Sequence, residues 1–172
     1  MTPALLSPVQ AVAIALTLLK TSQAAGPVTI DPQSGASDFR LSDMGPDGNP
    51  NFRASFPAVA YNSVNNEYLV VWEGDDNTAP LADEENEIFG QRINAASGAE
   101  IGGDIRLSEV GLAGNANYDT ATPAVAYNSA QNEYLVVWYG DDNTPPLADN
   151  EYEVFGRRFA VEERIYLPLV LR

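Results

Sequence analysis

The sequence contains no cysteine and no histidine among its 172 residues. Without them the chain cannot build a Ser-His-Asp or Cys-His nucleophile, and it cannot bind zinc through imidazole or thiolate ligands. Any metal site would have to use oxygen ligands, which suit a hard cation such as Ca²⁺. No disulfide can stabilise the fold, so cysteine gives no information about the cellular compartment.

Basic residues are also scarce, with nine Lys plus Arg against 24 Asp plus Glu and a formal net charge of −15. A surface of this sign repels the phosphates of nucleic acids, so we expect no nucleic-acid binding. The same acidic surface would help to keep an exported protein in solution.

Long apolar runs are rare, and the clearest one is Ala11–Leu19. Its length and the small residues at Ser22–Gly26 are typical of a signal peptide, although Lys20 follows the run and no basic residue precedes it. A short membrane anchor and an ordinary helix remain as alternatives, because Ala4–Leu19 is short for a spanning helix. We therefore predict a signal peptide or short membrane anchor at residues 1–26. The protein would be extracellular or at the cell surface, touching the membrane only through this segment if it is not cleaved.

The strongest signal in the chain is an internal duplication. When the sequence is shifted by 66 residues, residues 38–92 align with 104–158 without a gap, and 36 of the 55 positions are identical. Such a repeat indicates one supersecondary unit used twice. We divide the rest of the chain into a partial repeat at 27–42, repeat 1 at 43–108, repeat 2 at 109–159 and a C-terminal tail at 160–172. The same pattern would also fit a chain that is a fragment of a longer repeat array.

Each repeat predicts four short strands separated by turn residues. In the first copy they are Ala58–Tyr61, Tyr68–Trp72, Glu87–Ile93 and Ile105–Ser108, and Phe39–Ser42 is an earlier relative of the last one. The second of these strands is apolar on both faces, which is expected when a strand lies between two sheets. Almost nothing after Gly26 has a helical period.

This pattern predicts an all-β fold made of two four-stranded antiparallel, propeller-like blades. A β-sandwich of paired repeats and a β-solenoid are the alternatives. Phe39–Ser42 would complete the last sheet, as closing strands do in a ring. Two blades cannot close a ring by themselves, so we expect either a homo-oligomer that completes it or an open two-sheet fragment.

The motifs Pro57–Asn62, Glu67–Trp72 and Glu87–Arg92, with their copies 66 residues later, resemble a group of repeats in secreted and cell-surface bacterial proteins. The resemblance covers about residues 28–159 and implies a β-propeller-like fold, mostly without an assigned activity. It leads us to expect a non-enzymatic structural or adhesion module that meets a partner at the cell surface. A carbohydrate-binding module and a small glycosidase or lyase are the alternatives.

Acidic residues concentrate in the long loop after the second strand of each repeat. Such carboxylates could bind Ca²⁺, which takes six to eight oxygen ligands. No EF-hand spacing is present, and solvated or turn-capping roles are the competing interpretation. The candidate calcium ligands are Asp75, Asp76, Asp83 and Glu85 in repeat 1, and Asp141, Asp142, Asp149 and Glu151 in repeat 2.

Trp72 and Trp138 end the doubly apolar strand beside these loops. They are candidate ligand-binding residues, because an indole can stack on a sugar ring, but the same position also suits a core residue. Paired acids can hydrolyse glycosides only when one of them has a raised pKa in an enclosed pocket. Acids duplicated almost unchanged do not favour two distinct roles, so we expect no catalytic residues.

Overall fold

The computed structural model describes residues 38–161, and the predictions for residues 1–37 and 162–172 lie outside this range. Internal contacts divide the chain into two units, Met1–Phe39 and Arg40–Arg172. The fold described here belongs to the second unit.

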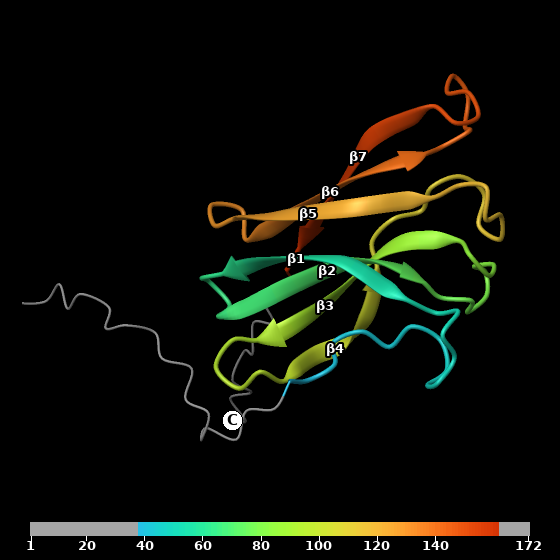
Figure 1. The fold of residues 1–172 in the computed structure, drawn as a ribbon. Coiled ribbons are helices and arrows are strands. Elements are labelled where there is room, and N and C mark those ends of the chain that lie inside the picture. The colour runs from blue at the N-terminus through green and yellow to red at the C-terminus, as the bar shows by residue number, and fades with distance from the viewer. Residues whose placement is uncertain (1–37, 162–172) are drawn as a thin grey trace, which may run out of the picture. The chain divides into compact units, whose positions relative to one another are not determined.

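Within residues 38–161, seven antiparallel strands form two sheets, which confirms the all-β prediction (Figure 1). The first sheet has the order β1-β2-β3-β4, and the second has the order β5-β6-β7. The strands of the first sheet are β1 (Ala54–Asn62), β2 (Glu67–Asp75), β3 (Asn86–Asn94) and β4 (Glu100–Arg106). Those of the second are β5 (Thr120–Asn128), β6 (Glu133–Asp141) and β7 (Tyr152–Ala160).

The duplicated sequence produces the same local geometry twice. Val71 pairs with Ala58 and Gly90 in the first sheet, and Val137 pairs with Ala124 and Gly156 in the second. Both first strands are interrupted by an irregularity at the same place, between Ser55 and Ala58 and between Ala121 and Ala124. The repeat is therefore a structural unit and not only a sequence pattern.

Two details of the predicted architecture are wrong. No strand forms over Phe39–Ser42, and Leu41 and Ser42 lie instead beside Trp72 of the first sheet. The second sheet accordingly has three strands in the described range instead of four. A strand from the start of the chain can complete the last sheet only where a closed ring makes the first and last sheets neighbours, and two sheets form no such ring, as the sequence led us to expect.

The fourth strand of the first sheet is also shifted from its predicted position. It was expected at Ile105–Ser108 and is observed at Glu100–Arg106. The ladder ends because Leu107 N and Ser108 N both donate to the carbonyl oxygen of Ile88, at 2.6 and 3.3 Å, and the Ser108 hydroxyl accepts from Ile88 N. Leu107 then leaves the sheet and enters the core.

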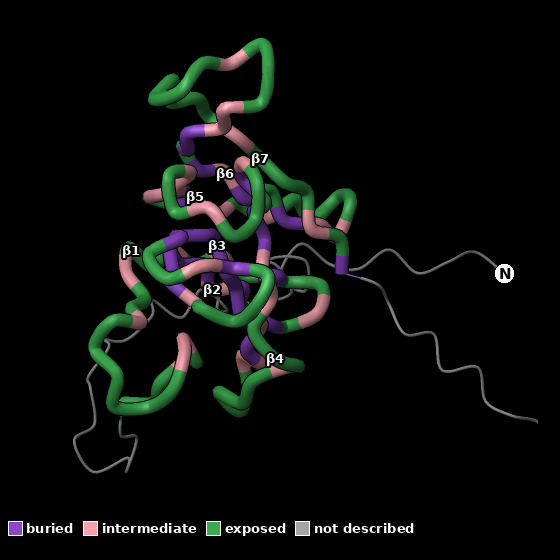
Figure 2. The backbone as a smooth tube through the Cα atoms, turned by 90° about the vertical axis from the view of Figure 1, so that its right-hand side faces the viewer, coloured by how far each residue is buried: buried purple, intermediate pink, exposed green. Residues whose placement is uncertain are grey.

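The two sheets stack through an apolar core, with β5 lying across β1, β2 and β3 (Figure 1). In Figure 2 most buried residues lie in β2 and β3 and alternate with less buried ones along β6, while most residues of the connecting loops are exposed. The fully buried residues of this core include Leu69, Val71, Tyr134 and Val136. Burying side chains of this size stabilises the fold by about 1.5–3 kcal/mol each.

Each sheet has two apolar faces, which we name after their central residue. The Leu face comprises Ala58, Ala60, Leu69, Val71 and Gly90 in repeat 1, and Ala124, Ala126, Leu135, Val137 and Gly156 in repeat 2. The Tyr face comprises Val59, Tyr61, Tyr68, Val70 and Trp72 in repeat 1, and Val125, Tyr127, Tyr134, Val136 and Trp138 in repeat 2. The core joins the Leu face of repeat 1 to the Tyr face of repeat 2.

Candidate functional site

The long loops meet at one end of the first sheet, where the acidic residues are densest. Residues 76–85 follow β2, and residues 107–119 lead into β5. Gly114 N donates to Glu85 Oε2 across 2.8 Å, and Asn86 Nδ2 donates to Asp119 Oδ1 across 3.1 Å. Carboxylates therefore join two loops that are distant in sequence, as expected for alternate loops of antiparallel strands, which lie at the same end of a sheet.

Asp75 and Glu85 are fully buried, and each uses one carboxylate oxygen to hold the loop. Asp75 Oδ2 accepts from Glu84 N at 3.3 Å, and Glu85 Oε2 accepts from Ala82 N at 2.9 Å. The other oxygens, Asp75 Oδ1 and Glu85 Oε1, have no hydrogen-bond partner within the described residues. Half of each carboxylate is therefore committed to organising the backbone.

The second repeat makes the same bonds with its own acids. Asp141 Oδ2 accepts from Asn150 N at 3.0 Å, and Glu151 Oε2 accepts from Ala148 N at 2.9 Å. Asp141 is buried like Asp75, whereas Glu151 is exposed. The loop acids thus share a structural role that was duplicated with the fold.

The next acids along the loops cap turns. Asp76 Oδ1 accepts from Thr78 N at 3.1 Å, and Asp142 Oδ1 accepts from Thr144 N at 2.9 Å. A bond to the backbone two residues further on is the usual way in which an aspartate stabilises a turn. The capping interpretation of these two acids is therefore confirmed.

The remaining candidate calcium ligands, Asp83 and Asp149, are exposed. Within residues 38–161, no three acidic side chains lie close enough together to hold a metal ion. The calcium hypothesis consequently remains a prediction.

Burial raises the pKa of Glu73, Asp75 and Glu87 above their ordinary values, and loss of hydration is the largest cause for each. The Ser108 hydroxyl and the Arg106 guanidinium act in the opposite direction on the pKa of Glu87. A raised carboxyl pKa is one requirement of an acid catalyst. These three side chains are at most 9% exposed, however, so a substrate has little access to them.

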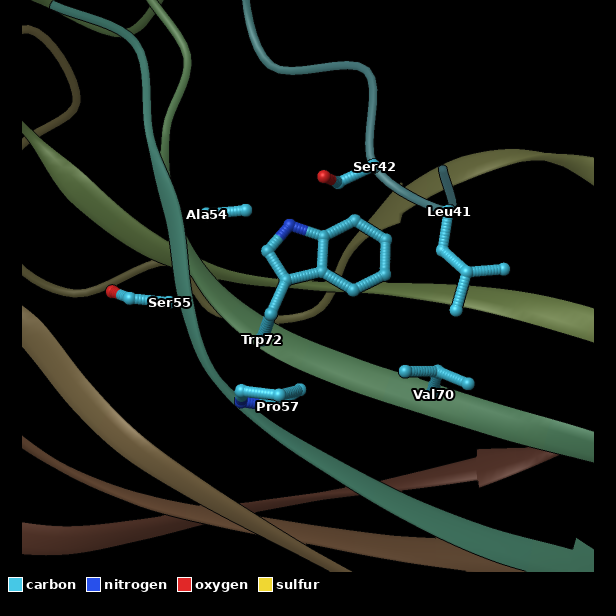
Figure 3. Close-up of a pocket in the computed structure, with 7 residues that line it drawn as sticks. All are labelled: Leu41, Ser42, Ala54, Ser55, Pro57, Val70 and Trp72. Atoms are coloured by element: carbon cyan, nitrogen blue, oxygen red, sulfur yellow. The ribbon is translucent and has the colours of Figure 1, made fainter. Parts of the chain in front are cut away.

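Trp72 lines an open apolar pocket of about 190 Å³ on the first sheet (Figure 3). Its indole lies between Leu41 and Ser42 on one side and β1, with Pro57, on the other. Trp72 itself is only 2% exposed, which places it in the wall of the sheet. A stacking platform needs an exposed ring face, and this conformation does not provide one.

Trp138 packs between the two sheets and is 6% exposed. It belongs to the same core cluster as Leu69 and Val71, although it is the copy of Trp72. The structure therefore separates the two tryptophans: one lies in the interface between the sheets, and the other lies on the open side of the first sheet.

The sequence predicted apolar faces on both sides of the second strand but did not identify which two faces remain uncovered by the stacked sheets. These are the Tyr face of repeat 1 and the Leu face of repeat 2, where Tyr68 and Leu135 are exposed. The available signal was the strand at 68–72 and its copy, which are apolar on both faces and so require a neighbour on each side.

Comparison with known proteins identifies no matching family model, curated protein or solved structure. The part of the chain that the structure describes contains no helix with the length and hydropathy needed to cross a bilayer. The functional argument therefore depends on the geometry and on the sequence pattern.

Proposed function

We propose that this chain is a non-enzymatic structural or adhesion module of the bacterial cell surface, built from two propeller-like blades. The observation that carries the proposal is the matched use of loop acids in both repeats. Asp75 and Asp141 hold the start of equivalent loops, and Glu85 and Glu151 hold their ends. The backbone bonds that the two repeats share therefore maintain the shape of the loops.

The same observation argues against a hydrolase. Acid and base catalysts need different environments, so catalysis normally breaks the symmetry between repeats. Here the equivalent acids make equivalent backbone bonds. Asp75, Glu85 and Asp141 are buried, so a substrate has little access to them. Calcium is not part of the proposal, because the acids within the described range form no ligand cluster.

A rigid scaffold with long loops at one end is suited to binding a partner. The acids Asp83, Glu84 and Asp149 are exposed at the loop tips, where a partner can reach them. The predicted signal peptide or anchor at residues 1–26 and the repeat resemblance both favour an extracellular or surface location. A partner with basic or hydroxyl-rich groups would complement such tips.

The test compares the full chain with a loop-tip variant, D83K/E84K/D149K, whose substitutions lie at exposed positions. Binding of both proteins is measured on a glycan array and on immobilised bacterial cell-wall preparations. We expect the wild type to bind one of these surfaces and the variant to lose at least tenfold in affinity, with an unchanged thermal midpoint.

Hydrolysis is measured in parallel on a broad panel of chromogenic glycosides. Turnover by the wild type that disappears in D75N/D141N would overturn the non-enzymatic proposal. Wild-type binding that survives the loop-tip substitutions would show that the loops are not the contact surface. Glycan binding that depends on Trp72 would instead support the carbohydrate-binding alternative.

A further inference from the structure

The two sheets of the chain meet through unlike faces. The Leu face of repeat 1 packs against the Tyr face of repeat 2, so the contact is head-to-tail. The opposite sides of the sheets are not covered by the other sheet. They are the Leu face of repeat 2 and the Tyr face of repeat 1, which is closed by Met44 and Leu81 at Trp72 and open at Val59, Tyr61 and Tyr68. These open faces have the same residue types as the two that form the core.

The open faces carry apolar side chains that are exposed to solvent. Leu135 is 46% exposed on the Leu face of repeat 2, and Val59 is 60% exposed on the Tyr face of repeat 1. Their copies inside the chain, Leu69 and Val125, belong to the core or pack against it. Exposed sheet faces of this kind mark interaction surfaces.

We propose that a second copy of this chain docks its open Tyr face onto the open Leu face, repeating the contact between the two sheets. The occupant is specified by complementarity, because the Tyr face of the same sequence already fits a Leu face within each molecule. A head-to-tail contact adds copies until a ring closes, or continues as an open array.

A buried polar group supports the same pairing. Tyr134 donates from its hydroxyl to Glu67 Oε1 across the sheet interface at 3.4 Å, and Arg92 Nε donates to the same oxygen at 3.0 Å. On the open Leu face, Glu133 is held in the same way by Arg158, whose Nε donates at 2.9 Å. A docked Tyr68 hydroxyl would take the place that Tyr134 has in the core.

The open Leu face also has an unfilled notch. In the first sheet the absent side chain of Gly90 makes room for Leu107, whose Cδ1 would lie 2.9 Å from a Cβ at that position. At Gly156, the copy of Gly90, the nearest atoms to such a Cβ belong only to its own sheet. Leu41 of the second copy is the relative of Leu107 and would fill this notch.

The polar residues around this leucine complete the match. Glu87 accepts from the Arg106 guanidinium and the Ser108 hydroxyl, which secure the segment at the end of β4. Arg40 and Ser42 are the copies of Arg106 and Ser108, and they lie in the segment next to the open Tyr face. In the assembly they would bind Glu153, which is exposed on β7, and residues 40–42 would take the place beside β7 that residues 106–108 take beside β3.

This inference deepens the proposed structural role by naming the second copy as the partner of the sheet faces. The test uses full-length variants that place a charge on one face, L135E for the Leu face and V59E for the Tyr face. L112E is the matched control, because Leu112 is 74% exposed in a loop that belongs to neither face. Thermal unfolding checks that each variant keeps its fold.

Mass is measured by size-exclusion chromatography with light scattering over a range of concentrations. We expect the wild type and L112E to associate, and L135E and V59E to be monomeric when each is alone. Mixing the two monomeric variants should yield a 1:1 dimer, because each retains one intact face that complements the other.

A wild type that stays monomeric would overturn the docking proposal. It would also be overturned if either single-face variant associated like the wild type, as a contact between like faces or through another segment would allow. Neither result would affect loop-tip binding to glycans or cell walls, so failure of this inference can be distinguished from failure of the proposed function.

Discussion

Gly90 and Gly156 show how one residue acquires two roles through its position in the repeat. Both are glycines in the third strand of their sheet, opposite Val71 and Val137. A Cβ at Gly90 would meet Leu107 at 2.9 Å and the backbone oxygen of Val70 at 3.2 Å. At Gly156 the closest atom would be 3.3 Å away, in the side chain of Val137.

We therefore predict that G90A destabilises the chain more than G156A does. Overpacking a filled core costs about 1–3 kcal/mol, so G90A should lower the free energy of unfolding by an amount in this range. G156A should change it by less than about 0.5 kcal/mol, because an open strand position tolerates alanine. Urea unfolding of both variants measures the difference, and equal losses would show that Leu107 does not fill the Gly90 notch.

At the scale of elements, the turns between the first two strands of each repeat join the two sheets. Asn132 accepts from Asn62 Nδ2 at 3.0 Å and donates to Asn65 Oδ1 at 3.1 Å, so it bonds across the interface. Among the described residues, the side chain of Asn66, its copy, bonds only with the Tyr61 hydroxyl, from which it accepts at 2.9 Å, and Asn132 has the equivalent bond from Tyr127 at 3.0 Å. Both asparagines have a positive φ, 48° and 52°, which glycine also adopts easily.

This difference predicts that N132G is more destabilising than N66G. Glycine preserves the backbone conformation at both positions, so the comparison isolates the side-chain bonds. Two bonds between the sheets at about 1 kcal/mol each give an expected difference of about 2 kcal/mol in unfolding free energy. Chemical denaturation measures it. If the two variants unfolded at the same midpoint, the asparagine bridge would not contribute to sheet stacking.

Local sequence signals were sufficient to place most strands but not their neighbours. Ala58–Tyr61, Tyr68–Trp72 and Glu87–Ile93 lie within β1, β2 and β3, because β-branched residues and turn signals act locally. The strand predicted at 39–42 was wrong, because a strand forms there only if a sheet edge is available for it to pair with. The sequence also did not reveal which face of Tyr68–Trp72 is covered, since both faces are apolar.

Site residues show the same limit. The density of acids in the loops was evident, but their use was not, because a carboxylate that binds backbone N–H groups looks the same in sequence as one that binds a cation. The role of Asp75 and Asp141 in holding the loops became visible only from the bonds that they accept from Glu84 N and Asn150 N. The open faces were implied by the doubly apolar strand, and their residues became identifiable only from the strand register.

The whole molecule has a large negative charge and several carboxyls whose pKa is raised by burial. They are Glu73, Asp75, Glu87 and Asp104. A raised pKa in the folded state means that this state binds more protons than the unfolded chain between the two pKa values. Their contribution to stability is therefore fully present below the ordinary pKa and is lost as the pH rises through the folded-state pKa.

We predict that the free energy of unfolding rises as the pH falls from 7 toward 4.5, the ordinary pKa of glutamate. Relief of repulsion among surface carboxylates would act in the same direction, so salt is needed to separate the two causes. In about 1 M NaCl the Debye length is about 3 Å, which screens exposed charges but not the burial of a carboxyl. Urea unfolding at both pH values should therefore show a rise in the free energy of unfolding that persists in salt. This rise should be smaller in E73Q/D75N. A rise that salt abolishes would assign the effect to surface repulsion.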